Sequence, residues 1–168
     1  GFMHLDGYMD VCDAVLSRRE LATRQRILKD SHCGAFAVIG MVLLALCQWS
    51  VFLSGSAGES LWGLLLIPVA TRACAGLAVL KLRPMGTSQY AAMGRHGGYA
   101  AALAVLLAAA IAVPLVTDRS FAPLAAAAGY GLAVWYGFRQ LDGMNGDISG
   151  FALTLGELAG AAVWTLVR

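Results

Sequence analysis

Five long apolar segments dominate the sequence and restrict the folds open to it. They lie at residues 34–54, 60–80, 97–117, 120–138 and 148–167. Each is close to the ~20 residues that an α-helix needs to cross the hydrocarbon core of a bilayer, and none alternates with the period of two that marks a strand. Because the connections are short, consecutive helices are expected to be antiparallel neighbours. The sequence therefore predicts an all-α, polytopic membrane helical bundle with about five transmembrane helices.

The composition excludes several other classes of protein. Hydrophobic residues make up 59% of the chain and charged residues only 13%, whereas a soluble domain carries about 25% charged residues. A mean hydropathy of +0.70 and a net charge of +2 argue against a disordered chain, a basic nucleic-acid-binding domain and an ordinary soluble enzyme. We expect a lipid bilayer around the protein and no nucleic acid as partner, and we leave a homo-oligomer open.

The basic residues are sorted to one side of the predicted bundle. Of the twelve lysines and arginines, only Arg119 and Arg168 fall on the opposite side, and Arg72 lies inside a span. An excess of basic residues in short loops marks the cytoplasmic side. The sequence thus predicts a multi-pass protein whose basic side, including Arg95, faces the cytoplasm.

Acidic residues gather on the same side, most clearly in the first sixteen residues. Asp6, Asp10 and Asp13 are spaced i, i+4, i+7, which places them within about 60° of one another on a helix. They lack basic neighbours and lie among apolar residues. A solvated helix face is one interpretation, but a row of mutually repelling carboxylates is better explained by Mg²⁺, which prefers carboxylate oxygens.

The segment that follows the acidic row is predicted to hold a second short helix. Ser17 and Glu20 have the spacing of a capping box, which predicts a helix at about residues 18–29. We interpret residues 1–33 as an acidic catalytic helix, amphipathic or half-buried, followed by a basic cytoplasmic segment. Residues 34–168 form the bundle, and the whole of 1–168 forms one membrane-embedded domain.

Two polar junctions precede the first and the fifth span. Lys29, Asp30 and Ser31 come before the first, and Asn145 and Asp147 come before the fifth. Either junction is explained by helix capping alone. Because both carry acids on the face that holds the acidic row, we favour a shared site.

Two charged residues lie inside the spans. A charge near the bilayer centre costs about 2.5–3.5 kcal/mol even on lenient scales. Arg72 and Glu157 both lie ~12–14 Å below the cytoplasmic face at 1.5 Å per residue. This equal depth is consistent with a structural ion pair and also with the base of a substrate cavity, which we favour.

Three motifs in the right order resemble the cobalamin synthase family, adenosylcobinamide-GDP ribazoletransferase. The segment FMHLDG at residues 2–7, with Asp10 and Asp13, is similar to the family's HLDGLADTxDG. The segment KDSHCGAFAVI at 29–39 is similar to KDSxxGAFGVI, and NGD at 145–147 followed by LGEL at 155–158 is similar to TGDxxGAxxELxEL. Arg72 falls where the family has an arginine in an apolar helix. Departures occur at Tyr8, Met9, Ala14 and Asn145.

The resemblance implies a transferase that joins α-ribazole or its 5′-phosphate to adenosylcobinamide-GDP and releases GMP, in the last steps of adenosylcobalamin synthesis. It implies a bacterial or archaeal cell (inner) membrane, and further helices ahead of residue 1. The implied site has Mg²⁺ held by Asp6, Asp10, Asp13 and Asp147. Asp10, Asp13 and Asp30 would be catalytic, and the substrate would be bound by Lys29, Ser31, Arg72, Asn145 and Glu157.

Two other functions are open to a chain with these features. A membrane phosphotransferase of the CDP-alcohol type also uses several aspartates and a divalent metal, but its motif is not matched after Asp6 and Gly7. A secondary transporter would use Arg72 and Glu157 as a coupling pair, but it favours internal repeats and midplane sites. The sequence shows no repeat, and its acids lie at one face.

Overall fold

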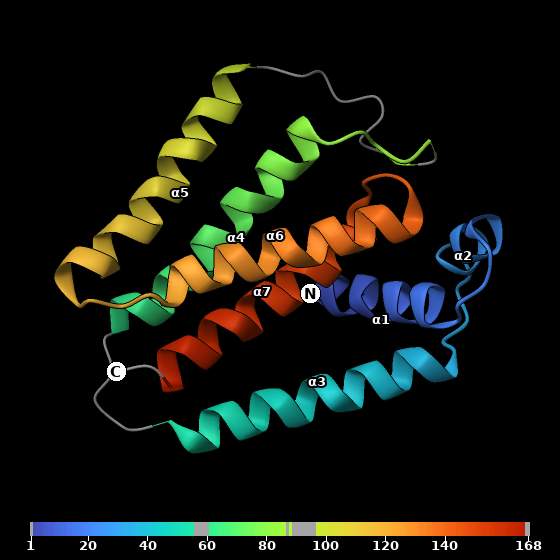
Figure 1. Cartoon of the computed structure of the whole chain (residues 1–168), viewed down its shortest axis with the longest axis horizontal. Coiled ribbons are helices and arrows are strands. Elements are labelled where there is room, and N and C mark those ends of the chain that lie inside the picture. Colours follow the sequence, from blue (N-terminus) through green and yellow to red (C-terminus); the bar gives the residue numbers. More distant parts are fainter. Residues whose placement is uncertain (1, 56–60, 87, 89–96, 167–168) are drawn as a thin grey trace.

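In the computed structural model, the described part of the chain forms seven α-helices (Figure 1). The structure describes residues 2–55, 61–86, 88 and 97–166. The helices are α1 (Met3–Leu16), α2 (Leu21–Ile27), α3 (Ala35–Ser54), α4 (Leu61–Lys81), α5 (Gly97–Thr117), α6 (Ala122–Leu141) and α7 (Gly146–Leu166). Arg95, Arg168 and the predicted span ends at residues 60 and 167 lie outside the described residues.

The predicted all-α membrane bundle is confirmed. A long helix occupies each of the five predicted spans, and α3, α4, α5 and α7 are long and apolar enough to cross a membrane. The remaining one, α6, has 20 residues but a more polar composition, because it carries Tyr130, Tyr136, Arg139 and Gln140. The acidic segment is helical as predicted and forms α1.

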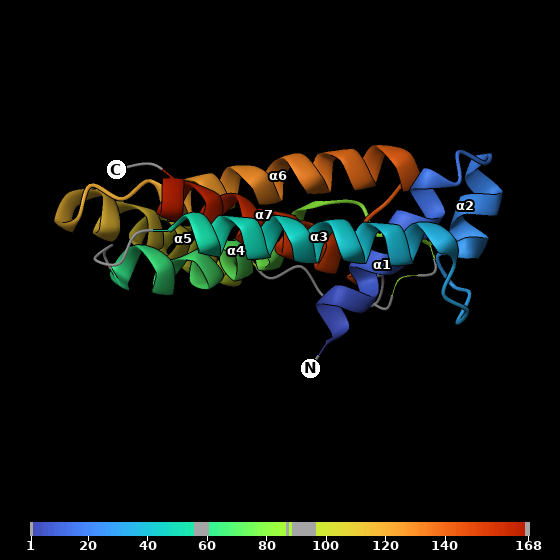
Figure 2. The same ribbon diagram turned by 90° about the horizontal axis from the view of Figure 1, so that it is seen from below.

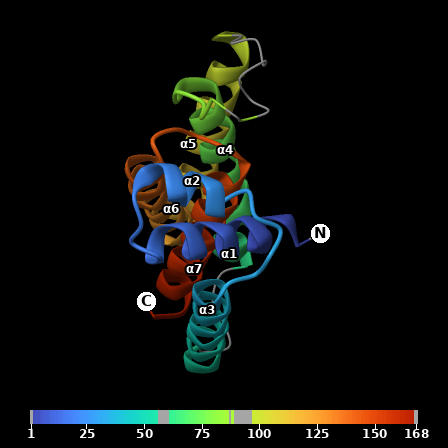
Figure 3. The same ribbon diagram turned by 90° about the vertical axis from the view of Figure 1, so that its right-hand side faces the viewer.

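Helix α7 is the centre of the bundle and α3 and α5 are its margins. About 61% of the apolar window of α7 is buried, against 17% for α3 and 11% for α5. Seen along the bundle in Figure 3, α3 lies at one edge and α4 with α5 at the opposite edge, and α1, α6 and α7 lie between them. Leu43, Trp49 and Val105 are among the large apolar side chains left exposed on α3 and α5. These two helices therefore present the surface expected of a lipid-facing protein.

Small residues let the central helices approach closely. A Cβ atom added to Gly156 of α7 would lie 2.8 Å from the Ala126 carbonyl oxygen, and one added to Gly160 would lie 2.8 Å from the Ala126 Cβ. Such contacts are how helices pack in lipid, where apolar burial itself gives little driving force. The long contact between α6 and α7 (Figure 2) depends on these positions.

The predicted capping box is wrong. Helix α1 continues to Leu16, and Ser17 lies at its C-terminal end, where its hydroxyl donates to the Ala14 carbonyl at 2.7 Å. Arg18 then takes a φ of 51°, and α2 begins at Leu21 with Glu20 in the N-cap position. Burial of Val15 in the core extends α1, so Ser17 ends one helix and does not begin the next.

The alternating directions of α3 to α7 bring the basic segments together at one end of the bundle, which we call the basic end. It comprises α1 and α2, the start of α3, the end of α4, the start of α5 and the α6–α7 connection. The basic residues described there are Arg18, Arg19, Arg24, Arg26, Lys29, Lys81, Arg83 and Arg139, whereas Arg119 lies between α5 and α6 at the other end.

Candidate active site

The contact between α1 and α7 positions the acidic residues. A Cβ added to Gly7 would lie 2.8 Å from the Cα atom and 2.9 Å from the carbonyl oxygen of Asp147. One turn further, a Cβ added to Gly150 would lie 3.0 Å from the His4 carbonyl oxygen. The two backbones therefore meet with no side chain between them. This close approach places Asp147, at the start of α7, beside the acidic row of α1.

The electrostatics of Asp10 show that these acids form one cluster. Burial, and after it the negative charges of Asp6, Asp147 and Asp13, together raise the pKa of Asp10 to about 6. A carboxylate is disfavoured where it loses water and meets like charges. We call Asp6, Asp10 and Asp147 the carboxylate cluster. Among the described residues, no lysine or arginine forms an ion pair with these three acids, and a bound cation would supply the neutralising charge.

Asp13 belongs to the same row but has a different environment. Its Oδ2 accepts the Gly34 N–H at 2.5 Å and its Oδ1 accepts the Ala37 N–H at 3.0 Å. N–H groups at the start of a helix have no acceptor within that helix, and the helix dipole there favours a negative charge. A Cβ on residue 34 would lie 2.6 Å from the Asp13 Oδ1, so a larger residue there would displace the Asp13 carboxylate. Asp13 thus caps α3 from a neighbouring helix.

A polar hollow of about 250 Å³ brings three predicted site residues together. Lys29, Asn145 and Asp147 line it, with Leu28, Met85, Ser88 and Gly146. The Asn145 Oδ1 accepts the Ile148 N–H at 3.0 Å, and its Nδ2 donates to the Asp147 Oδ2 at 2.7 Å. Asn145 therefore caps α7, as the capping interpretation predicts, and it also orients Asp147.

The connection that follows α4 forms one wall of this hollow. The Met85 N–H donates to the Met144 carbonyl and the Met144 N–H donates to the Arg83 carbonyl, each at 2.9 Å. Arg83 also pairs with Asp142, which has a φ of 57°. These contacts fix residues 83–85 against the α6–α7 connection, so the hollow is built from three segments distant in sequence.

Asp30 and Ser31 lie apart from the carboxylate cluster. Asp30 is exposed and accepts a hydrogen bond from the His32 backbone N–H at 3.0 Å and contacts the His32 ring Nδ1 at 2.6 Å, which lowers the pKa of Asp30. It lines a second hollow, of about 480 Å³, with Arg26 and Lys29. Ser31 is exposed in the turn before α3. The interpretation that one of the two caps α3 is wrong, because Asp13 does so.

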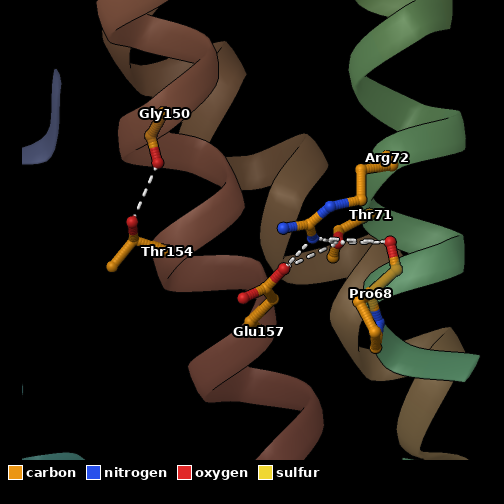
Figure 4. Close-up of polar contacts among 6 residues, drawn as sticks. All are labelled: Pro68, Thr71, Arg72, Gly150, Thr154 and Glu157. Atoms are coloured by element: carbon orange, nitrogen blue, oxygen red, sulfur yellow. Dashed lines mark hydrogen bonds and ion pairs between the residues drawn. The ribbon is translucent and has the colours of Figure 1, made fainter. Parts of the chain in front are cut away.

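Arg72 and Glu157 form an ion pair, the first of the two arrangements that their equal depth allows (Figure 4). The Thr71 hydroxyl also donates to the Glu157 Oε1 at 3.3 Å, and Thr71 is fully buried. Each partner lines a cavity of its own. Arg72 borders a cavity of about 620 Å³ between α4, α5 and α7, and Glu157 borders one of about 310 Å³ between α3, α4 and α7. The pair therefore separates two cavities, away from the polar hollow.

The carboxylate cluster fits Mg²⁺ by its chemistry. Asp6, Asp10 and Asp147 offer hard oxygen donors, and none of them is in an ion pair with a described residue. Asp13 fits less well, since both of its oxygens already accept backbone N–H groups. Among the residues described, no three His, Cys, Asp or Glu side chains converge on one point. The acids are thus neighbours, and rotation of their side chains would be needed to bind one ion jointly.

Sequence reasoning missed the residues that build this end of the molecule without carrying charge. Gly7 and Gly150 set the α1–α7 contact, and Ser88 and Met85 line the hollow. Glycines in apolar helices indicate close helix contacts, so the sequence could have identified these two glycines. Ser88 and Met85 had none, because they lie in a connection without a motif.

The apolar helices and the polar groups at their basic end define a multi-pass helical membrane protein with a carboxylate-rich site at one end. Residues 1–165 match the family model described as cobalamin-5-phosphate synthase. The chain belongs to this family, as the three motifs predict.

Several relatives match nearly the whole chain, among them the two described next. The adenosylcobinamide-GDP ribazoletransferase of Clostridium perfringens strain 13 is 37% identical over 167 residues, which cover 95% of this chain and 66% of the relative. The protein of the same name from Geobacillus kaustophilus is 32% identical over 181 residues, covering 99% of this chain and 68% of the relative. The chain thus spans 66% of the length of the Clostridium perfringens relative. No solved structure matches it.

Proposed function

We propose that this chain catalyses, with Mg²⁺, the transfer of the adenosylcobinamide phosphate group from adenosylcobinamide-GDP to α-ribazole or its 5′-phosphate, with release of GMP. This would be one of the last steps of adenosylcobalamin synthesis. The names of the relatives support the reaction. The observation that carries the proposal is the carboxylate cluster beside a hollow that also holds Lys29 and Asn145.

The reaction requires a proton acceptor and charge neutralisation. A ribose hydroxyl of α-ribazole forms a new bond to the phosphorus that carries cobinamide, the diphosphate P–O bond to GMP breaks, and the hydroxyl proton moves to a base. Asp10 suits the role of base, because its carboxylate does not cap a helix and a pKa near 6 leaves it ionised at neutral pH. Asp13 suits it less, since its oxygens accept the Gly34 and Ala37 N–H groups.

The remaining polar groups have roles that follow from their places. Mg²⁺ bound by Asp6 and Asp147, with Asp10 beside them, would neutralise the diphosphate and the charge that develops on the leaving GMP. Lys29 supplies a positive charge at the same hollow, and Asn145 holds Asp147 in place. Asp30 and Ser31 would contact substrate from the second hollow and the turn beside it, with Arg26 contributing positive charge.

Transfer of labelled α-ribazole tests the proposal. The purified protein in nanodiscs, supplied with adenosylcobinamide-GDP, is expected to form labelled cobalamin with Mg²⁺ and none with EDTA. The joint change Asp6→Asn and Asp10→Asn is expected to abolish both the reaction and Mg²⁺ binding. Glu20→Gln is the matched control, because Glu20 is an exposed acid between α1 and α2. Normal Mg²⁺ binding by the double variant would contradict the metal site.

The site is proposed to face the cytoplasm of a bacterial or archaeal cell, because the basic end carries it. Cys33 is exposed just before α3 at that end, and Arg119 lies at the other. In intact cells, a membrane-impermeant maleimide is expected to spare a variant whose single cysteine is Cys33 and to label one whose single cysteine comes from Arg119→Cys. The reverse pattern would place the site outside the cytoplasm.

A further inference from the structure

An apolar cavity of about 620 Å³ lies between α4, α5 and α7, separate from the polar hollow. Its walls are mainly aliphatic, and they include Ala75, Gly76 and Val79 of α4 and Ala102, Leu103 and Leu106 of α5. Sites for small organic ligands have volumes of about 300–1,000 Å³, are mostly apolar and hold a few placed polar groups. The cavity meets this description, and the proposed chemistry at the carboxylate cluster does not use it.

The cavity adjoins the carboxylate cluster through the contact between α1 and α7. His4 and Ser149 both line it. His4 precedes Asp6 by two residues, Ser149 follows Asp147 by two, and a Cβ on Gly150 would lie 3.0 Å from the His4 carbonyl oxygen. A ligand in the cavity would therefore have one end at the helix contact that positions Asp147.

The charge in the cavity favours a neutral ligand. Arg72 lines it, but Glu157 neutralises this arginine. The hydrogen bonds of Arg72 to Glu157, Thr71 and the Pro68 carbonyl all use Nη1. In Figure 4 the other terminal nitrogen of Arg72 has no partner among the residues drawn. The cavity thus offers N–H donors between apolar walls, which suits an apolar ring system that carries an acceptor nitrogen.

We propose that this cavity binds the bicyclic base of α-ribazole, with Arg72 donating to the free ring nitrogen and the ribose directed toward the α1–α7 contact. The proposal rests on the proposed function and names the place of one substrate. α-Ribazole is neutral and its dimethylbenzimidazole base is largely apolar. The other substrate carries a diphosphate, which the polar hollow with Lys29 accommodates better. The 5′-phosphate of α-ribazole phosphate would lie on the ribose side, outside the apolar walls.

Filling the cavity tests this assignment. Ala102 and Ala104 are both exposed residues of α5, but only Ala102 lines the cavity. In nanodiscs, Ala102→Phe is expected to raise the Kd and the KM for α-ribazole at least about tenfold, without a change in the KM for adenosylcobinamide-GDP. Ala104→Phe, on the opposite side of the same helix, is expected to match the wild type in both constants. Helix content by circular dichroism checks that both variants fold.

A second experiment tests the proposed hydrogen bond from Arg72 to the ring nitrogen. The double change Arg72→Met and Glu157→Gln removes the donor and leaves no unpaired charge. It is expected to weaken binding of labelled α-ribazole about tenfold, and to leave unchanged the binding of a dimethylindole riboside, which lacks the free ring nitrogen. Equal weakening for both ligands would overturn the hydrogen bond to Arg72.

The outcomes separate this inference from the proposed function. Unchanged α-ribazole binding in Ala102→Phe, with transfer intact, overturns the inference alone. Loss of α-ribazole binding in Ala102→Phe, when the wild type binds but does not transfer, supports the inference and overturns the reaction. A wild type that neither binds nor transfers α-ribazole overturns both.

Discussion

The carboxylate cluster and the Arg72–Glu157 pair are two ways of placing charge in a membrane protein. In the first, Asp6, Asp10 and Asp147 repel one another, and the pKa of Asp10 rises to about 6. In the second, opposite charges on α4 and α7 meet within hydrogen-bonding distance, and the buried Thr71 hydroxyl adds a third contact. Removing one partner of an ion pair leaves an uncompensated charge and destabilises the bundle, whereas a like-charged cluster weakens the bundle until a cation binds. Substitutions should therefore have opposite effects on stability in the two regions.

The largest expected effect follows from Asp10→Asn. If Asp10 takes the hydroxyl proton, kcat should fall about 10²–10⁴-fold, as is usual when a general base is removed. The measurement is the initial rate of labelled cobalamin formation at saturating substrates. A fall in kcat of less than about tenfold would assign the proton to another group.

The same substitution should stabilise the protein in the absence of divalent cations. The pKa of Asp10 is higher in the folded state than its ordinary value of 3.8. Its contribution to stability is therefore complete below pH ~4 and is lost as the pH rises through about 6. In EDTA, Asp10→Asn should unfold at a higher temperature than the wild type at pH 7.5 and at the same temperature at pH 4. A lower unfolding temperature at pH 7.5 would contradict the repulsive cluster.

Gly7→Ala should move Asp147 away from Asp6 and Asp10 without removing a charged side chain. The new Cβ would lie 2.8 Å from the Asp147 Cα, so α1 must move away from α7. A displacement of about 1 Å at such a site costs on the order of 10²-fold in rate. Gly131→Ala on α6 is the control, since nothing lies within 4 Å of its added Cβ. Equal transfer rates in the two variants would show that the helix contact does not position the acids.

Removal of one partner from the ion pair should destabilise the bundle. Arg72→Met leaves the Glu157 carboxylate unpaired between apolar helices, at an expected cost of about 2–3 kcal/mol in the free energy of unfolding. The double change Arg72→Met and Glu157→Gln should recover most of this loss, because no charge remains to be desolvated. Unfolding by SDS titration in mixed micelles measures both. An additive double variant would show that the two side chains do not interact.

Much of the fold and part of the site could be predicted from local sequence. Apolar length located five helices, the i, i+4, i+7 spacing located Asp6 and Asp10 on one face, and depth counting showed that Arg72 and Glu157 could meet. What failed depended on contacts distant in sequence. Asp30 and Ser31 adjoin α3 in sequence, yet Asp13 caps α3 from 21 residues before Gly34. Ser17 had the spacing of an N-cap, but the buried face of α1 extended to it.

The smallest expected effect tests whether Asp13 caps α3 and differs in this role from Asp6 and Asp10. Asp13→Asn keeps an acceptor for one N–H of α3 but loses the charge at the helix start, which should cost about 1 kcal/mol of stability. Stability should fall here, whereas in EDTA at pH 7.5 it should rise in Asp10→Asn, although the two acids are one turn apart on α1. Because Asp13 caps a helix, the variant should also keep Mg²⁺ affinity within about threefold, measured by calorimetry. A loss of Mg²⁺ binding in Asp13→Asn comparable to that in Asp10→Asn would show that Asp13 binds the metal together with the carboxylate cluster.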